Sequence, residues 1–178
     1  AREFMLCSLG RLCPVSTPEG KRTGLVGQMA IACSVSRDRF NCVEALHSCI
    51  AHLLCDASGP KGALLAAKAT GVWFSGQFRG LTYKPYEVVA AMRKARRDGQ
   101  LPRDIGVSLH GTKDEVVFIE VRHHAGRLLR PLIPLDVYRV PLPRNSTWSQ
   151  YIQEGRLEVL DAREESGAYV AAVETQAT

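Results

Sequence analysis

The stretch that decides how this chain is built runs from Gly10 to Val26 and reads GRLCPVSTPEGKRTGLV. It holds two prolines and three glycines, and proline fixes φ while glycine permits positive φ. This composition predicts an ordered irregular loop rather than a helix or a strand. Arg11, Lys21 and Arg22 flank the rigid part, and backbone N–H groups in such loops can face phosphates.

Downstream of this loop, apolar periodicity predicts three helices. Residues 42–55 carry apolar side chains at helical spacing, and Asn41 with Glu44 resembles a capping box at the start. Residues 85–97 begin with a proline and are followed closely by a glycine, which is typical of helix boundaries. A shorter helix is expected over residues 148–154.

Strands are predicted between these helices. Residues 71–78 indicate a hairpin about Ser75-Gly76. The other predicted strands cover residues 104–109, 115–121, 157–160 and 168–173. Residues 25–35 are expected to be strand-like or a buried extended segment, and residues 127–135 to continue extended. The predicted fold class is α+β, with mixed short strands and helices.

The composition is that of a folded protein with a mild basic excess. The 178 residues are 46% hydrophobic and 23% charged, with a net charge of +5, enough for one sizeable core or two small domains. Basic excess suits nucleic acid or an acidic protein surface, and also proteins that touch neither. No apolar run of about 18 residues is present, so no membrane span is expected. The opening residues 1–5 resemble neither a signal peptide nor an initiator sequence, which predicts an excised fragment.

Possible metal ligands have structural interpretations that fit better. The six cysteines form no C-x-x-C pair, which disfavours a zinc ribbon. Cys49, His52 and Cys55 could share a helix face, but buried thiols are the better interpretation. His123 and His124 would point to opposite faces of a strand, which disfavours joint ligation.

Most charged groups near the end of the chain are expected to be solvated or structural. Asp161, Glu164 and Glu165 could bind a cation, although a solvated acidic turn is the simpler expectation. Arg127 and Arg130 are placed to brace loops through fork-shaped hydrogen bonds. A solvated helix end is expected for the cations of helix 85–97, which are Arg93, Lys94, Arg96 and Arg97. No nucleophile with a base and no P-loop is evident, so catalysis by this chain alone is not expected.

Four further blocks follow the opening loop. They are Val72-Trp-Phe-Ser-Gly76 with Gly80, Met92-Arg-Lys-Ala-Arg-Arg97-Asp-Gly99, Ala125-Gly-Arg127 with Arg130-Pro131-Leu132, and Thr147-Trp148 with Glu154-Gly155, Glu158, Asp161-Ala162 and Glu164-Glu165. The loop and these blocks closely resemble, in the same order, the second-largest subunit of multisubunit DNA-directed RNA polymerases. The hairpin block is more similar to the eukaryotic, archaeal and large-virus enzymes than to the bacterial one.

The resemblance implies an internal segment with three parts. Residues 1–35 would be the end of the fork region with its TPEG loop, residues 36–165 a compact external domain, and residues 166–178 a tail leading to the hybrid-binding domain. Residues implied to lie near nucleic acid are Arg11, Thr17, Pro18, Glu19, Gly20, Lys21 and Arg22. Residues implied to hold the architecture are Gly76, Gly80, Arg97, Gly126, Arg127, Arg130, Pro131, Trp148, Asp161, Glu164 and Glu165.

The chain departs from the family pattern at three informative positions. Ser16 replaces the glutamate that usually precedes TPEG, and Leu9 stands where tryptophan or tyrosine is common. His124 replaces the aspartate of the DAGR motif, so any salt bridge of that aspartate is absent or altered. These differences suggest a divergent lineage, such as a protist or viral enzyme.

The resemblance also implies where the chemistry lies. Catalytic Mg²⁺ would be bound outside this segment, which would support DNA-templated RNA synthesis by the assembled nucleotidyltransferase. Its partners would be the largest subunit, other polymerase subunits, the DNA template and the RNA–DNA hybrid. The expected location is the nucleus, with a viral particle or factory or the archaeal cytoplasm as alternatives. Two other hypotheses are a free-standing basic module that binds a transcription protein or nucleic acid, and a small metal-dependent hydrolase using Glu164, Glu165 and a histidine.

Overall fold

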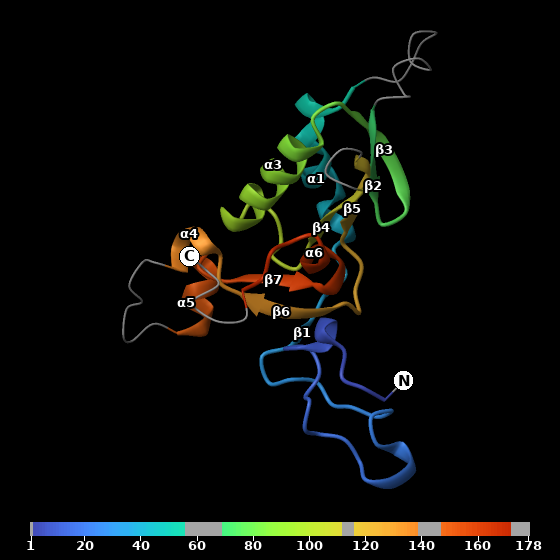
Figure 1. Ribbon diagram of the computed structural model, residues 1–178. Coiled ribbons are helices and arrows are strands. Elements are labelled where there is room, and N and C mark those ends of the chain that lie inside the picture. Colours follow the sequence, from blue (N-terminus) through green and yellow to red (C-terminus); the bar gives the residue numbers. More distant parts are fainter. Residues whose placement is uncertain (1, 56–68, 112–115, 139–146, 172–178) are drawn as a thin grey trace.

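The computed structural model describes residues 2–55, 69–111, 116–138 and 147–171, and its architecture is α+β, as predicted (Figure 1). The strands are β1 (Ser34–Val35), β2 (Thr70–Phe74), β3 (Gln77–Thr82), β4 (Gly106–Gly111), β5 (Val116–Arg122), β6 (Leu128–Leu132) and β7 (Glu158–Asp161). The α-helices are α1 (Val43–Ile50), α3 (Pro85–Arg97), α4 (Leu135–Tyr138), α5 (Trp148–Gln153) and α6 (Ala162–Ser166). Short 3₁₀ turns are η1 (Leu6–Ser8), η2 (Gly20–Arg22), η3 (Phe40–Cys42) and η4 (Ala51–Leu53). No helix in the described ranges is long and apolar enough to cross a membrane.

The strands form two sheets. The larger has the order β3-β2-β5-β4, with β2 and β5 parallel and the outer pairs antiparallel. The smaller has the order β1-β6-β7 and is antiparallel throughout. Because β1 comes from the N-terminal part, the smaller sheet joins residues 34–35 to the second half of the chain. The N-terminal segment then extends away from this sheet, on the side opposite to α3 (Figure 1).

The hairpin and the helix predicted around residues 71–97 are confirmed. Ser75 and Gly76 connect β2 to β3 with φ of 45° and 87°, and positive φ at both central residues is the mark of a type I′ turn. Helix α3 covers the predicted residues with Pro85 in its first turn. The strands predicted at 104–109 and 115–121 correspond to β4 and β5, apart from residue 115, which lies outside the described residues.

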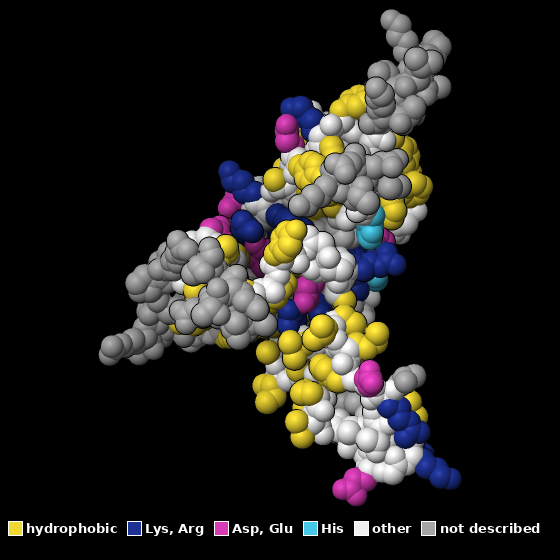
Figure 2. Space-filling model, viewed as in Figure 1, with side chains coloured by type: hydrophobic (Ala, Val, Ile, Leu, Met, Phe, Trp, Pro, Cys, Tyr) yellow, Lys and Arg dark blue, Asp and Glu magenta, His cyan; other side chains and the backbone are white. Residues whose placement is uncertain are grey.

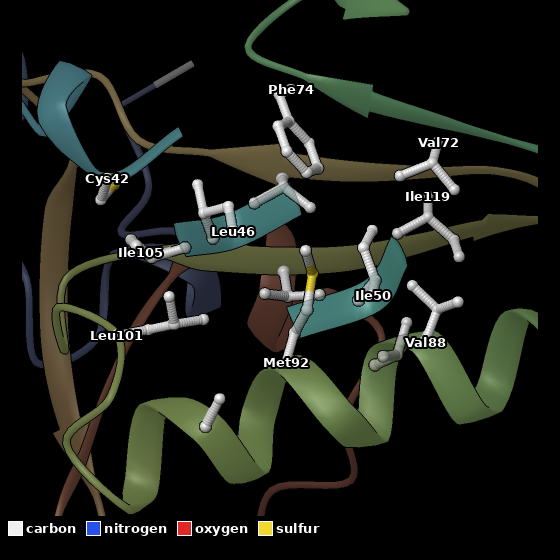
Figure 3. Close-up of a cluster of buried hydrophobic side chains, with 14 residues drawn as sticks. Cys42, Leu46, Ile50, Val72, Phe74, Val88, Met92, Leu101, Ile105 and Ile119 are labelled. Atoms are coloured by element: carbon white, nitrogen blue, oxygen red, sulfur yellow. The ribbon is translucent and has the colours of Figure 1, made fainter. Parts of the chain in front are cut away.

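The hydrophobic core lies where α1 and α3 pack against the larger sheet (Figure 3). Leu46 and Ile50 of α1, Met92 of α3, and Phe74 and Ile119 of the sheet are each at most 1% exposed. Burial of a side chain of this size contributes about 1.5–3 kcal/mol. The core therefore fixes α3, β4 and β5 relative to one another, and the charged cluster described below lies at their ends.

The expectation that residues 25–35 are buried is wrong. Leu25, Met29 and Ile31 are 62%, 48% and 106% exposed, and only Ser34 and Val35 form a strand. Apolar composition alone suggested burial, but the described part of the chain provides no second layer against which these side chains could pack. They form an exposed apolar surface next to the loop.

Three smaller predictions at the ends of elements are also wrong. Asn41 lies within η3, and Cys42 precedes α1 without a side-chain cap, so the capping box is absent. The extended stretch ends before residue 135, because Pro134 starts a helical turn in which its carbonyl accepts from Val137 and Tyr138. Residues 168–171 continue from α6 without forming a strand, and residues 172–173 lie outside the described residues.

Candidate nucleic-acid interface

Residues 13–28 form a loop whose two ends are joined by backbone hydrogen bonds. The N–H of Cys13 donates to the carbonyl of Gln28 (2.8 Å), and the N–H of Ala30 donates to the carbonyl of Arg11 (2.9 Å). The ends of the loop are thus held together, and its middle extends away from them. This geometry agrees with the ordered irregular loop that the prolines and glycines predict.

Threonine side chains hold the loop internally. The hydroxyl of Thr17 donates to the carbonyl of Val26 (3.0 Å) and accepts from the N–H of Gly24 (2.9 Å). The hydroxyl of Thr23 donates to the carbonyl of Gly20 (2.8 Å). Each bond between a side chain and the backbone satisfies a polar group that the irregular path leaves unpaired. The threonine of the TPEG sequence therefore shapes the loop.

The tip of the loop presents two exposed cations. Lys21 and Arg22 lie in η2 and are exposed, and neither forms an ion pair with an acidic group among the described residues. Basic side chains are visible towards the bottom of the molecule, where the N-terminal segment lies (Figure 2). An open cavity of about 460 Å³ lies beside them, lined by Thr17, Pro18 and Arg22 among others. Unpaired cations on an ordered backbone suit phosphate groups.

Arg11, in contrast, is buried and lies at the base of the loop. Its side chain is 4% exposed. The guanidinium donates to the carbonyls of Cys7 (2.8 Å), Leu128 (3.1 Å) and Leu160 (3.0 Å) and to the carboxylate of Glu165 (2.6 Å). These contacts direct the donors of Arg11 into the protein, so this member of the set implied to lie near nucleic acid is not exposed. The described residues of that set that remain exposed are Thr17, Pro18, Glu19, Gly20, Lys21 and Arg22.

The acidic residues at the end of the chain form an arginine–carboxylate cluster with arginines from several elements. We define this cluster as Glu158, Asp161, Glu164, Glu165 and their partners Arg11, Arg93, Arg96, Arg97, Arg122, Arg127 and Arg130. The expectation of a solvated acidic turn is therefore wrong. All four carboxylates lie on two consecutive elements: Glu158 and Asp161 on β7, and Glu164 and Glu165 in the first turn of α6. Their arginine partners hold these elements against α3 and the two sheets, which we call the body.

Glu164 is the most buried member of the cluster. It is 1% exposed, and its carboxylate accepts from both terminal nitrogens of Arg96 (2.8 Å each), from Arg93 Nε (3.2 Å) and from the N–H of Val107 (2.9 Å). A solvated helix end is thus wrong for Arg96, which is 2% exposed. The sequence held a signal for this burial, because Arg96 lies four residues after the buried Met92 on the same face of α3.

Asp161 joins the larger sheet to the loop that precedes β6. Its carboxylate accepts from Arg122 (2.8 Å), from Arg127 (2.8 Å) and from the N–H of Glu164 (2.9 Å), which caps α6. Arg127 Nε also donates to the carbonyl of His124 (3.1 Å), the residue that stands where the resembling family has aspartate. The contact made at this position therefore comes from the backbone and does not need the aspartate side chain.

The remaining residues implied to be structural are two arginines of the cluster and several residues in turns, in strands or at the start of a helix. Arg97 contacts Glu158, and both Nε and a terminal nitrogen of Arg130 donate to Glu165 (2.9 and 2.5 Å). The others are Gly76 in the hairpin turn, Gly80 on β3, Gly126 before Arg127, Pro131 in β6 and Trp148 at the start of α5.

The surroundings of two carboxylates change their pKa values. Burial alone would raise the pKa of Asp161, but the hydrogen bond from the Glu164 N–H and the guanidinium groups of Arg127 and Arg122 hold it below its ordinary value. Burial likewise opposes ionisation of Glu158, and the neighbouring Arg96 outweighs it and lowers the pKa of Glu158. Both groups therefore bind protons less readily in the folded state than in the unfolded chain.

These lowered pKa values predict that acid destabilises the protein. A carboxylate with a depressed folded-state pKa stabilises the fold at every pH above its unfolded pKa, and this stabilisation is lost as pH falls through the folded value. For Asp161 and Glu158 the loss begins near their ordinary values of 3.8 and 4.5. We expect these two carboxylates to cause no change in the urea unfolding midpoint between pH 7 and pH 5. Below pH 4 the midpoint should fall. Asp161→Asn should reduce this fall of the midpoint at low pH. An unchanged fall would contradict the role assigned to Asp161.

Comparisons with known proteins match most of the chain. Residues 72–136 match the family model described as RNA polymerase Rpb2, domain 4, and residues 1–35 match RNA polymerase Rpb2, domain 3. DNA-directed RNA polymerase subunit Rpo2 of Sulfolobus acidocaldarius is 28% identical over 96% of this chain. DNA-directed RNA polymerase III subunit RPC2 of Schizosaccharomyces pombe is 27% identical over 99%, and DNA-directed RNA polymerases IV and V subunit 2 of Arabidopsis thaliana is 31% identical over 91%. The matched regions make up 16%, 16% and 14% of those relatives, so the chain spans a small part of their length.

Proposed function

The chain belongs to the family of second-largest subunits of DNA-directed RNA polymerase, and from this premise we propose that it is a structural and positioning segment of a transcribing polymerase. In the assembled enzyme it supports DNA-templated RNA synthesis by nucleotidyl transfer. Residues 1–35 form the end of the fork region, residues 36–165 the external domain, and residues 166–178 a tail towards the hybrid-binding domain. The alternative of a free-standing basic module is not favoured by the comparisons.

The observation that carries the nucleic-acid part of this proposal is the charge of the loop tip. Lys21 and Arg22 have no acidic partner among the described residues, whereas most arginines of the body are paired with carboxylates. Phosphate groups of a template or hybrid are the complementary anions. Contacts of this kind position nucleic acid without reading its sequence, which is what a polymerase acting on any template requires.

The segment is proposed to leave catalysis to other parts of the assembly. Mg²⁺-assisted phosphoryl transfer needs carboxylate oxygens that are free to coordinate metal. Every carboxylate oxygen of Glu158, Asp161, Glu164 and Glu165 accepts at least one hydrogen bond from an arginine or a backbone N–H. Among the described residues no group of three His, Cys, Asp or Glu side chains is placed to hold a metal ion. These residues do not fit a Mg²⁺ site, and we place the metal outside this segment.

The partners proposed for the segment are the largest polymerase subunit, the smaller subunits, the DNA template and the RNA–DNA hybrid. The eukaryotic and archaeal relatives support a location in the nucleus or in the archaeal cytoplasm. A viral particle or factory remains an alternative location within the same proposal.

Affinity purification of the tagged protein from its native cells tests membership in a polymerase. We expect the largest subunit and its small companions in near-stoichiometric amounts, and DNA-templated RNA synthesis in the purified fraction. An untagged strain controls for background. Recovery of the protein alone, or with proteins unrelated to transcription, would contradict the proposal and favour the free-standing module.

A further inference from the structure

One arginine side chain links the base of the loop to the body, in addition to the pairing of β1 with β6 that follows the loop. Arg11 lies where the two ends of the loop meet, since its carbonyl accepts from Ala30. Its guanidinium donates to the carbonyls of Leu128 in β6 and Leu160 in β7 and to the carboxylate of Glu165 in α6. Through this side chain the loop contacts three elements that are more than a hundred residues away in sequence.

Glu165 is the only acidic group that Arg11 contacts among the described residues, and it holds a second arginine at the same time. Its Oε2 accepts from Arg11 (2.6 Å) and from Arg130 Nε (2.9 Å), and its Oε1 accepts from a terminal nitrogen of Arg130 (2.5 Å). The side chains of Arg11, Arg130 and Glu165 are only 4%, 12% and 14% exposed. Two poorly hydrated guanidinium groups placed close together repel each other, and the negative charge of the carboxylate between them offsets that repulsion.

Arg130 in turn contacts the chain directly before the loop. Its guanidinium donates to the carbonyl of Leu9 (3.3 Å). A Cβ on Gly10, which has a φ of 72°, would lie 3.0 Å from Arg130 Cδ, so the backbone approaches this arginine closely. The path of residues 9–11 is therefore set by two arginines that share Glu165.

We propose that Glu165 is the positioning residue of the loop: it fixes the direction in which residues 17–22 leave the body, by holding Arg11 at the base of the loop and Arg130 beside it. This inference rests on the proposed function, because it makes Glu165 act on nucleic acid through the loop. Glu165 itself is fixed by α6, whose first turn is capped by Asp161 and whose Glu164 is bound by α3.

The test measures how tightly the assembled polymerase retains a preformed RNA–DNA hybrid within duplex DNA as KCl is raised. Removing one phosphate contact lowers the salt slope of binding by about one. We expect Lys21→Ala with Arg22→Ala to lower the slope by about two, and Glu165→Gln to lower it by about one to two. In the variant that already carries Lys21→Ala and Arg22→Ala, which we call the loop variant, Glu165→Gln should cause no further change in the slope. Glu87→Gln, in the exposed pair with Lys84, is the control that should leave the slope unchanged.

The outcomes separate the inference from the proposed function. If the loop variant lowers the slope and Glu165→Gln does not, the positioning role is overturned while the loop keeps its place at nucleic acid. If Glu165→Gln lowers the slope further in the loop variant, Glu165 acts through another route and the inference fails. An unchanged slope in the loop variant would overturn the proposed placement of the loop. Should Glu165→Gln not assemble, Arg11→Lys keeps the charge but loses the fork-shaped contacts, and it is judged by the same outcomes.

Discussion

Replacing Glu164 with glutamine is expected to lower the free energy of unfolding by about 3–5 kcal/mol. The substitution keeps the size of the side chain and removes the charge that compensates Arg96, which is 2% exposed. Burial disfavours the charged form of Arg96. The neighbouring carboxylates, Glu164 more strongly than Glu158, outweigh this effect and raise the pKa of Arg96. Arg96 therefore stays a cation and is left with one carboxylate, Glu158. Urea unfolding of the wild-type and variant proteins measures the difference.

The matched control is an exposed ion pair of the same chemistry. Glu87 pairs with Lys84 at 2.9 Å with more than half of each side chain exposed, and Glu87→Gln should cost no more than about 1 kcal/mol. The double variant Glu164→Gln with Arg96→Met should lose less than the sum of the two single losses, because it also removes the uncompensated cation. Equal losses for Glu164→Gln and Glu87→Gln would show that the buried cluster does not stabilise the fold.

Replacing Gly106 with alanine is expected to cost about 3 kcal/mol. Gly106 begins β4, and a Cβ at this position would lie 2.5 Å from Asp161 Oδ2 and 2.9 Å from a terminal nitrogen of Arg127. Both atoms belong to an ion pair that is 2.8 Å long and less than a tenth exposed. One added methyl group must therefore separate a buried ion pair or move β4, the edge strand that packs against α6 and α3. The change in the urea midpoint at constant slope reports the cost.

Gly27→Ala serves as the control for this substitution. A Cβ on Gly27 meets no atom of the described residues within 4 Å, and the φ of Gly27 is not positive. It should change stability by no more than about 1 kcal/mol, and reduced freedom of the unfolded chain favours a small gain. A Gly106→Ala variant as stable as Gly27→Ala would mean that the Asp161–Arg127 contact can shift at no cost.

The elements that sequence reasoning predicted well are those with local signals. Helix α3 combines a proline in its first turn, a buried stripe and a glycine beyond its end, all within about fifteen residues. The hairpin depends on two adjacent turn residues, Ser75 and Gly76. Periodicity and turn chemistry act over short distances along the chain, so one sequence is sufficient to identify such elements.

The charged cluster escaped prediction because its partners are far apart in sequence. Glu164 lies 68 residues from Arg96, and Glu165 lies 154 residues from Arg11. No local rule pairs residues at such separations, so the acidic turn and the cations at the end of α3 were expected to be solvated, whereas Arg127 and Arg130 were expected to brace loops. The exposed apolar surface of residues 25–35 has a related cause, since composition indicates that a side chain prefers burial but not which element buries it. Proline and glycine content predicted residues 10–24 as an ordered irregular loop, and the family resemblance implied its place near nucleic acid. That Lys21 and Arg22 lack an acidic partner among the described residues became clear only from the pairing of the other arginines.

The contact between Arg11 and Glu165 also bears on how the protein is made. A ribosome adds about 5–20 residues per second, so 154 residues separate the synthesis of these two partners by roughly 8–30 s. During that interval the nascent N-terminal segment has its apolar side chains exposed and Arg11 without its carboxylate. The larger sheet with α1 and α3 can form as soon as β5 has left the ribosome. We therefore expect the larger sheet to fold before the contact between Arg11 and Glu165 attaches the base of the loop to the body.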